Sequence, residues 1–339
     1  MPAEDHRIDV VIAWVDGSDP EHRAKHLRHL KPGAKERTTR YADCGEIYYC
    51  IASILKFAPF INRIWIVTDA QRPKFLDEFA KAGLCSAEFI RVVDHTELFG
   101  EHADALPTFS ARAIEAMVWR IPGLSEQYVY FNDDFFINRP LKPEDWFVDG
   151  KPVLRGRKVR PDRWLFRTRA RRLLSKFNLV DARRLGSPTY HRAQELGATH
   201  AGVTEHFMLA DHHPHPMRRS VQEAFYAAHP EVLRNQVSYR FRDIAQFSPV
   251  ALANHLEIIV HGATYAGPPA MMQARPDSRN LNRRLVAEIS SEAKPFGCIQ
   301  SLDKFDAETL GLVRRLMREK WGDFLPRAIE FADDGGVKR

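Results

Sequence analysis

The amino-acid sequence predicts an α/β protein built on a mainly parallel sheet with helices on both faces. Short apolar runs rich in β-branched and aromatic residues alternate along the chain with segments whose apolar residues have helical spacing. This alternation is typical of a parallel sheet covered by helices, because its strands are buried on both faces. A chain of 339 residues is also long enough to bury such a core.

The first half of the chain predicts three strands and one long helix. Residues 8–15 form a β-branched run that ends in the turn cluster Asp16-Gly-Ser-Asp-Pro20. Residues 21–38 are polar and basic, and we expect Pro32-Gly33 to break any helix there. Residues 45–56 have apolar positions at helical spacing, and residues 63–69 and 88–94 read as further strands that end in polar residues.

The second half predicts one more central strand and several helices. A helix is expected from 110 to 120, with Ser110 as its N-cap and Pro122-Gly123 as its end. A buried strand follows from residue 127 and leads into Asn132-Asp-Asp134. Helices at 218–228 and 307–321 complete this half.

The neighbouring acids Asp133 and Asp134 are the most informative feature of the sequence. They lie between apolar residues, where two unpaired carboxylates would be costly to bury. A divalent cation such as Mg²⁺ removes that cost, since it prefers oxygen ligands and substrate phosphates. The alternative is a strand end whose carboxylates reach solvent. Asp16 and Asp69 also fall at strand ends, where parallel sheets bind ligands.

The composition gives an expected location. No apolar run approaches the roughly 18 residues of a membrane-spanning helix, and the N-terminus leads into the first strand without the apolar segment of a signal peptide. The four cysteines form no CxxC pair and no disulfide-like framework. We therefore expect a cytoplasmic protein.

The positive charge is concentrated in one segment. Residues 151–186 contain thirteen Lys or Arg and two Asp, a net charge of +11, in a chain whose total is +6. This segment belongs to a predicted basic insertion, 151–204, which we expect to be helical from 167 to 177. Such a block predicts a polyanionic partner, namely anionic lipid, an acidic polysaccharide or nucleic acid. The alternative is a solvated helix face. No nucleic-acid-binding motif accompanies it, so we expect no nucleic acid. We expect the block to recruit a growing acidic polymer or anionic membrane, the latter by peripheral contact at its inner face.

The sequence resembles the Stealth proteins in four blocks. The first is Ile8-Asp-Val-Val-Ile-Ala-Trp-Val-Asp-Gly-Ser-Asp-Pro20, and the second extends from Arg40-Tyr-Ala-Asp-Cys-Gly-Glu46 to Tyr130-Phe-Asn-Asp-Asp134. The third is His212-His-Pro-His-Pro-Met-Arg-Arg219 with Tyr239-Arg-Phe-Arg242, and the fourth is Cys298-Ile-Gln-Ser-Leu-Asp303. The family comprises sugar-1-phosphate transferases, including bacterial capsular polysaccharide phosphotransferases and the lysosomal-enzyme GlcNAc-1-phosphotransferase.

The resemblance implies a fold and a reaction. The fold would be glycosyltransferase-A-like, with a nucleotide-sugar-binding α/β half in residues 1–150, the insertion, and residues 205–339 completing the same catalytic domain. The reaction would transfer a sugar-1-phosphate from a UDP-sugar to a hydroxyl of a glycan or polysaccharide acceptor and release UMP, in capsule or surface polysaccharide synthesis. Two alternatives stay open: a conventional glycosyltransferase that releases UDP, and a non-catalytic polyanion-binding protein.

The resemblance also implies residue roles. Mg²⁺ or Mn²⁺ would be held by Asp133, Asp134 and Asp303, and His212 would take the acceptor proton. Arg242 would contact phosphate oxygens. The catalytic set is Asp134, His212, Arg242 and Glu115. The expected substrate-binding residues are Asp16, Gly17, Arg40, Asp43, Glu46, Asp69, Asn132, His215 and Arg240.

Several of these roles have a structural alternative. Arg40, Asp43 and Glu46 either contact substrate or cap the helix that follows, and Glu115 would otherwise be an exposed helix glutamate. Trp14 is expected in the core. The histidines between His200 and His215 also suggest zinc, but Pro214 and Pro216 disfavour the helical ligand spacing that zinc sites often use.

Overall fold

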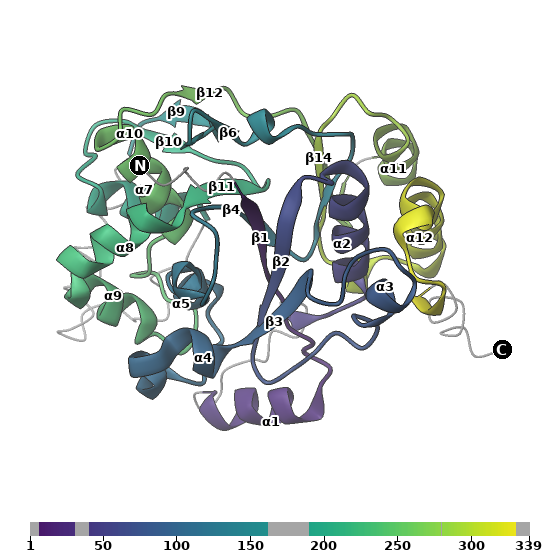
Figure 1. Ribbon diagram of the computed structural model, residues 1–339, viewed down its shortest axis with the longest axis horizontal. Helices are drawn as coiled ribbons and strands as arrows, with labels where there is room; N and C mark the ends of the chain where they lie inside the picture. The colour runs from purple at the N-terminus through teal and green to yellow at the C-terminus, as the bar shows by residue number, and fades with distance from the viewer. Residues whose placement is uncertain (1–6, 31–40, 162–189, 279, 330–339) are drawn as a thin grey trace.

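A five-stranded sheet runs through the middle of the molecule (Figure 1). The computed structural model describes residues 7–30, 41–161, 190–278 and 280–329. The strand order is β11-β4-β1-β2-β3, and β1 pairs in parallel with both β2 and β4, as β2 does with β3. Only β11 is antiparallel within this sheet. The strands are β1 (Ile8–Ala13), β2 (Ile61–Thr68), β3 (Ile90–Asp94), β4 (Gln127–Asn132) and β11 (His215–Arg218).

The strand order reverses between β1 and β4. The chain passes from β1 to β2 and β3 on one side and then crosses to β4 on the other side of β1. Ala13 pairs with Val67 of β2 and with Asn132 of β4, so the carboxyl ends of three strands are level. Such a reversal is where open α/β sheets form a crevice for ligands. The predicted α/β class with a mainly parallel sheet is confirmed.

Helices cover both faces of the sheet (Figure 1). On one side lie α2 (Glu46–Phe57), α3 (Glu78–Lys81), α11 (Leu281–Ile289) and α12 (Ala307–Trp321). On the other side lie α4 (His95–Phe99), α5 (Ala111–Glu115), α7 (Tyr190–His200), α8 (Arg219–Ala228), α9 (Pro230–Val237) and α10 (Pro249–Ile259).

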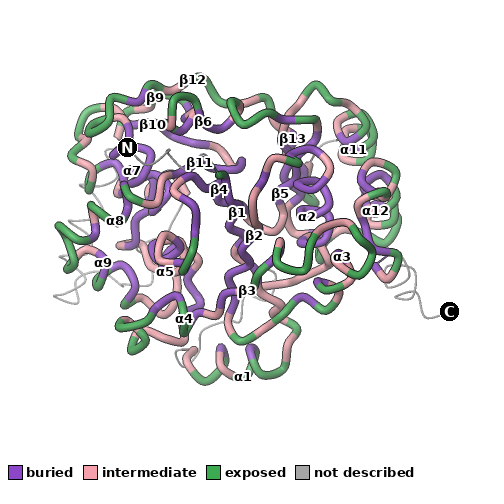
Figure 2. Tube along the Cα trace, in the orientation of Figure 1, coloured by how far each residue is buried: buried purple, intermediate pink, exposed green. Residues whose placement is uncertain are grey.

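The core has two layers, one on each face of the sheet. Val10 and Ile12 of β1 pack in one layer with residues of α2 and α12, and Val11 packs in the other layer with residues of α8 and α10. Alternate side chains of a strand point to opposite faces. The continuous apolar runs therefore reflect burial on both faces, and Figure 2 shows the strands as buried segments between more exposed helices.

Smaller sheets surround the central one. A three-stranded sheet has the order β13-β14-β5, formed by β5 (Phe135–Ile137), β13 (Met271–Ala274) and β14 (Phe296–Ile299). The two-stranded pairs are β6 (Phe147–Val148) with β7 (Lys151–Pro152), β8 (Leu154–Arg155) with β12 (Tyr265–Ala266), and β9 (Arg157–Val159) with β10 (Phe207–Leu209). Among the described residues, no helix is both long and apolar enough to cross a bilayer.

Two helical regions depart from the sequence predictions. Residues 21–38 were expected to lack a helix, but α1 (Pro20–His29) forms there, because Asp19 caps it and Pro20 begins it well before Pro32-Gly33. The helix expected over 110–120 is only α5 followed by the 3₁₀ turn η3 (Val118–Arg120), and the Ser110 hydroxyl bonds to Gln246 instead of capping.

The predicted basic insertion contains strands as well as a helix. Its described first part, residues 151–161, contains β7, β8 and β9, and its last part contains α7. The helix expected over 167–177 lies outside the described residues.

Candidate active site

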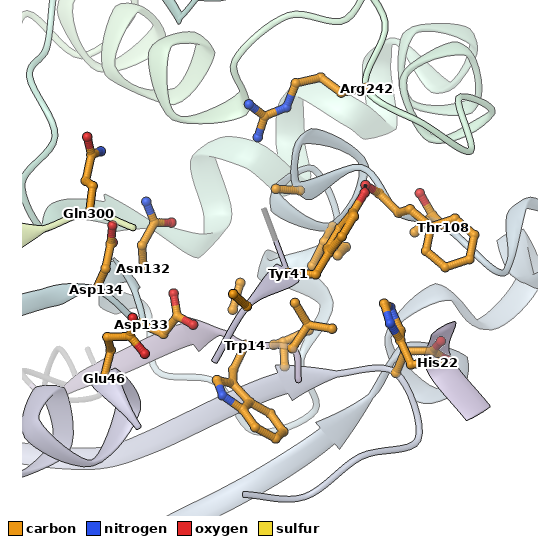
Figure 3. A pocket seen from close by; sticks show the side chains of 18 of the residues that line it. Trp14, His22, Tyr41, Glu46, Thr108, Asn132, Asp133, Asp134, Arg242 and Gln300 are labelled. Carbon is orange, nitrogen blue, oxygen red and sulfur yellow. Dashed lines mark hydrogen bonds between the residues drawn. The ribbon is translucent and has the colours of Figure 1, made fainter. Parts of the chain in front are cut away.

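A cavity of about 440 Å³ opens at the level carboxyl ends of β1, β2 and β4 (Figure 3). Trp14 follows β1, Asp69 follows β2, and Asp133 with Asp134 follows β4. These residues come from distant parts of the sequence and meet because parallel strands end at one edge of the sheet. The expected site residues that line this cavity are Glu46, Asp69, Asn132, Asp133, Asp134, His212, Arg242 and Asp303.

Asp134 is held in place by β14, which leaves one of its carboxylate oxygens free. The Cys298 thiol donates to Oδ2 at 3.4 Å, and the Ile299 N–H donates to the Asp134 carbonyl at 3.2 Å. The other carboxylate oxygen, Oδ1, is buried and has no hydrogen-bond partner. Burial raises the pKa of Asp134 to about 6, although the Cys298 thiol opposes this rise.

The unpartnered oxygen of Asp134 contrasts with a second buried carboxylate, whose oxygens have hydrogen-bond partners. Asp9 of β1 accepts hydrogen bonds from Asn62 Nδ2 at 2.7 Å, Trp65 Nε1 at 2.9 Å and the Ser125 N–H at 2.9 Å. A buried carboxylate satisfied in this way serves the fold. Asp134 Oδ1 lacks such partners and Asp134 lines a cavity, so this carboxylate is not satisfied by the fold alone.

Further acids lie around Asp133. Burial and the charge of Asp134, then of Glu46, raise the pKa of Asp133 well above its ordinary value. Glu46 begins α2 and accepts the Cys44 N–H at 2.6 Å, and burial raises its pKa to about 7. Asp43 accepts the Gly45 N–H at 3.0 Å, and burial raises its pKa as well. Like charges disfavour ionisation of one another, so a cation would relieve this group.

The oxygen ligands fit a hard cation in chemical type. Asp133, Asp134 and Glu46 line the cavity, and Asp303 lies exposed at its rim on the 3₁₀ turn η6 (Leu302–Lys304). Carboxylate oxygens are the ligands that Mg²⁺ prefers. Within residues 7–30, 41–161, 190–278 and 280–329, no three His, Cys, Asp or Glu side chains form a ready ligand cluster.

His212 presents a neutral imidazole to the cavity. Its ring stacks on Tyr190 with centroids 4.3 Å apart and contacts Phe135 edge-on at 6.4 Å. Burial, followed by the charges of Arg275 and Arg242, lowers the pKa of His212 to about 4. The ring is therefore unprotonated near neutral pH and can accept a proton.

Arg242 points into the cavity (Figure 3). Its Nε is buried without a hydrogen-bond partner. Glu115 does not line the cavity, and its pKa is raised to about 7 by burial, with the charges of Arg242 and Arg112 opposing the rise. The Glu115 carboxyl thus lies within electrostatic range of the Arg242 guanidinium, from outside the cavity wall.

Five expected substrate-binding residues, Asp43 among them, lie away from the cavity wall, and a sixth is not described. The Asp16 carboxylate accepts the N–H and hydroxyl of Ser18, and Gly17 allows close approach of Tyr41, whose backbone a Cβ at 17 would hit. Each is thus placed by local contacts. Arg40 lies outside the described residues.

His215 and Arg240 are the other two. His215 is buried on β11 with its ring 4.6 Å from that of His213. Arg240 donates to His29 Nδ1 at 2.9 Å and lines a separate hollow. Both lie in the third block, but β11 and the loop before α10 direct them elsewhere.

Several cavity residues were not expected from the sequence. Trp14 is buried in the core as predicted, yet it also lines the cavity. Both ring nitrogens of His95 and the Tyr130 hydroxyl are buried in this wall without hydrogen-bond partners. His95 directly follows the acid that ends β3, so the strand-end rule applied to Asp69 could have found it. Other wall residues that the sequence did not predict include His22, Tyr41, Thr108, Phe109 and Gln300.

Two protein-family models match the chain. Stealth protein conserved region 1 matches residues 6–28, and Stealth protein conserved region 2 matches residues 40–153. These matches include Glu46, Asp69, Asp133 and Asp134, whereas His212 and Arg242 lie outside them. The structure places residues from inside and outside these regions around one cavity.

Curated relatives match less than half of the chain. Receptor polysaccharide phosphotransferase WefC of Streptococcus oralis is 39% identical over 153 residues, 43% of this chain and 43% of that protein. Capsular polysaccharide phosphotransferase cps1A of Actinobacillus pleuropneumoniae is 41% identical over 147 residues, 41% of this chain and 38% of that protein. The matches therefore span less than half the length of either relative.

A solved structure also aligns with the chain. The apo form of mouse xyloside xylosyltransferase 1 covers 86% of this chain and 97% of its own, with a TM-score of 0.37 and 12% sequence identity.

Proposed function

Starting from a chain that carries Stealth conserved regions 1 and 2, we propose that this protein transfers a sugar-1-phosphate from a UDP-sugar to a hydroxyl of a polysaccharide acceptor. Two relatives that match at about 40% identity are named polysaccharide phosphotransferases, which supports transfer of a phosphate-linked group in polysaccharide synthesis. One observation carries the proposal: a carboxylate pair, a neutral imidazole and a guanidinium whose buried Nε has no hydrogen-bond partner line one cavity.

Each of these groups supplies one need of the reaction. A ring nitrogen of His212 takes the proton of the acceptor hydroxyl, whose oxygen then forms a bond to the phosphorus that carries the sugar. The bond from that phosphorus to the bridging oxygen breaks, and UMP leaves with the electron pair. Arg242 donates to the phosphate oxygens, where its planar fork suits bidentate contact. Positioning and electrostatic stabilisation dominate in such transfers.

A divalent cation, Mg²⁺ or Mn²⁺, belongs to this proposal. Asp133 and Asp134 would hold it, because Asp134 Oδ1 is buried without a partner. The rim carboxylate of Asp303 would be a third donor. When bound, it would neutralise charge on the diphosphate.

The nature of the released nucleotide tests the proposal. The protein is incubated with Mg²⁺, a panel of UDP-sugars and a capsular glycan acceptor, and UMP and UDP are separated by chromatography. Acceptor-dependent UMP supports the proposal, whereas UDP would indicate a conventional glycosyltransferase that attacks the anomeric carbon. Asp134→Ala should abolish product formation, while Asp323→Asn, at an exposed position outside the cavity wall, should not.

A non-catalytic polyanion-binding protein is the remaining alternative. It predicts no nucleotide release from any donor, and unchanged polyanion binding in Asp134→Ala. Nucleotide release by the wild-type protein and polyanion binding by Asp134→Ala therefore separate this alternative from a transferase.

We also propose that the protein acts in the cytoplasm and contacts the anionic inner face of the membrane through residues 151–186. Arg157 and Lys158 are exposed on β9 in the described part of this segment. Their charge favours anionic lipid. Sedimentation with vesicles tests this: charge reversal of Arg157 and Lys158 should weaken binding to anionic vesicles at low salt, and unchanged binding would contradict the proposal.

A further inference from the structure

The cavity has two chemically different sides (Figure 3). Asp133, Asp134, Asn132, Glu46 and Gln300 gather on one side, and this is where a cation and phosphates would lie. His22, Thr108 and Tyr41 lie toward the other, with Arg242 and Trp14 between them. His22, Thr108 and Tyr41 contribute no group to the proposed transfer of the sugar-1-phosphate.

Aromatic rings form much of the second side. The ring of His22, on α1, lies 5.8 Å from that of Tyr41 and 5.6 Å from that of Phe109, measured between centroids. The Tyr41 hydroxyl donates to the Phe109 carbonyl at 3.1 Å, which fixes the two segments together. All three side chains line the cavity. The His22 ring is tilted by 60° to that of Tyr41 and by 74° to that of Phe109, so the three rings form an angled aromatic wall that suits contact with a planar group.

His95 adds an unsatisfied polar group to this side. It begins α4 directly after β3, is 5% exposed and lines the cavity, and neither of its ring nitrogens has a partner. Its electrostatic neighbours include Asp69 and His22, which places it on the aromatic side. Burial lowers the pKa of His95 to about 4, so the ring is neutral, with one nitrogen that donates and one that accepts.

The charged groups near His95 already have a partner. Asp69 is paired with Lys25, whose Nζ lies 3.1 Å from both carboxylate oxygens. Neither ring nitrogen of His95 takes part in such a contact. A ligand that enters this side therefore meets aromatic side chains and one buried imidazole with free hydrogen-bonding capacity.

The in-line geometry of phosphoryl transfer indicates which part of the donor lies on this side. In phosphoryl transfer the attacking and leaving oxygens are roughly in line across phosphorus. His212, the proposed base, contacts Phe135, the residue after Asp134, so the acceptor oxygen approaches from the carboxylate side. The leaving nucleotide would then extend toward the side of the cavity away from Asp133 and Asp134, where His22 and Tyr41 lie.

We propose that the side of the cavity formed by His22, Tyr41, His95 and Phe109 binds the uracil base of the donor, with His95 as the residue that contacts the polar edge of the base. The inference rests on the proposed transfer from a UDP-sugar. Uracil offers a planar ring for the aromatic side chains and adjacent donor and acceptor groups for a neutral imidazole. His95 is thus a specificity-determining residue for the nucleotide.

Calorimetric titration of the whole protein with UMP and with ribose 5-phosphate, both in Mg²⁺, tests the inference. The two probes share ribose and phosphate and differ by the base, so their affinity ratio isolates the base. We expect UMP to bind at least about tenfold more tightly, and His95→Phe to lose most of that ratio, since the base edge would lack its partner in a buried site. His95→Gln, which keeps a donor and an acceptor, should retain part of it.

The probes also provide the controls. Unchanged ribose 5-phosphate affinity in His95→Phe shows that the variant is folded, and His261→Phe, at an exposed histidine outside the cavity wall, should leave the ratio intact. A wild-type ratio near one, an unchanged ratio in His95→Phe, or equal binding of AMP and UMP would overturn the inference.

The UMP-release assay keeps the two proposals separate. Acceptor-dependent UMP release together with an unchanged ratio in His95→Phe would mean that the base binds elsewhere in a working transferase. Absence of UMP release from every donor would instead remove the transferase on which the inference rests.

Discussion

Replacement of Asp134 by Asn should make the cation-free protein more stable while removing its activity. Burial raises the pKa of this carboxyl from an ordinary 3.8 to about 6. The ionised form is therefore disfavoured in the folded state, and above pH 6 the folded protein bears that cost. Asparagine has no charge to desolvate and still offers an oxygen to the Cys298 thiol.

The size and the pH range of the effect follow from the two pKa values. Because the folded-state pKa is the higher one, the native protein holds the proton longer, and stability falls as the pH rises from about 4 to about 6. At about 1.4 kcal/mol per pH unit, the full cost is roughly 3 kcal/mol. Asp134→Asn should thus be up to about 3 kcal/mol more stable than wild type at pH 7.5, and equal to it below pH 4.

Added Mg²⁺ should remove most of this difference in stability. A ligand that binds only the folded state stabilises it by about 2.7 kcal/mol at a hundred times its Kd. Wild type would gain this stabilisation, and Asp134→Asn would lose much of it together with a ligand. Asp323→Asn, at an exposed position, should follow wild type in both conditions.

Urea denaturation at pH 3.8, 5 and 7.5, with a chelator or with Mg²⁺, measures these free energies of unfolding. Two results would refute the reasoning. One is an Asp134→Asn variant that is no more stable than wild type at pH 7.5 with a chelator. The other is an equal gain from Mg²⁺ in both proteins.

Three further predictions address catalysis and packing. Arg242→Ala should lower kcat/KM for UMP release by about 10²–10³, and Arg242→Lys by less, because lysine keeps the charge but not the planar fork; similar losses in both would contradict this. Gly17→Ala should lower the free energy of unfolding by about 1–3 kcal/mol, since the added Cβ meets Tyr41; a neutral result would show that this segment moves easily. Arg218→Ala should lower the free energy of unfolding, measured by thermal denaturation, by about 3–5 kcal/mol. The Glu257 carboxylate is 3% exposed and accepts two hydrogen bonds at 2.7 Å from Arg218, so the variant leaves it buried without its partner. The double replacement Arg218→Met with Glu257→Leu should recover most of this loss.

Local patterns were sufficient to predict most of the central sheet. The runs at 8–15, 63–69 and 88–94 became β1, β2 and β3, because strands buried on both faces need apolar residues throughout. Helix bounds were less predictable where a side chain had a distant partner. Ser110 looked like a cap, but its hydroxyl bonds to Gln246, which is 136 positions away.

The candidate site was predicted unevenly for a similar reason. Asp69 and Asp133 were found because strand ends of a parallel sheet share one edge. Arg240 and Arg242 are two positions apart and equally basic, yet Arg242 enters the cavity while Arg240 bonds to His29. Sequence spacing cannot separate two such neighbours, since the path of the loop decides which way each side chain points.

By itself, the sequence determined which segments are buried strands and that charged oxygens follow them, because periodicity and desolvation act on neighbouring residues. The tertiary structure decided which of these groups meet. The crossing from β3 to β4 next to β1 brings Asp134 to Trp14, and β11 and the loop after α9 bring His212 and Arg242 to them. Such meetings depend on strand order and register, which are set by packing over the whole chain.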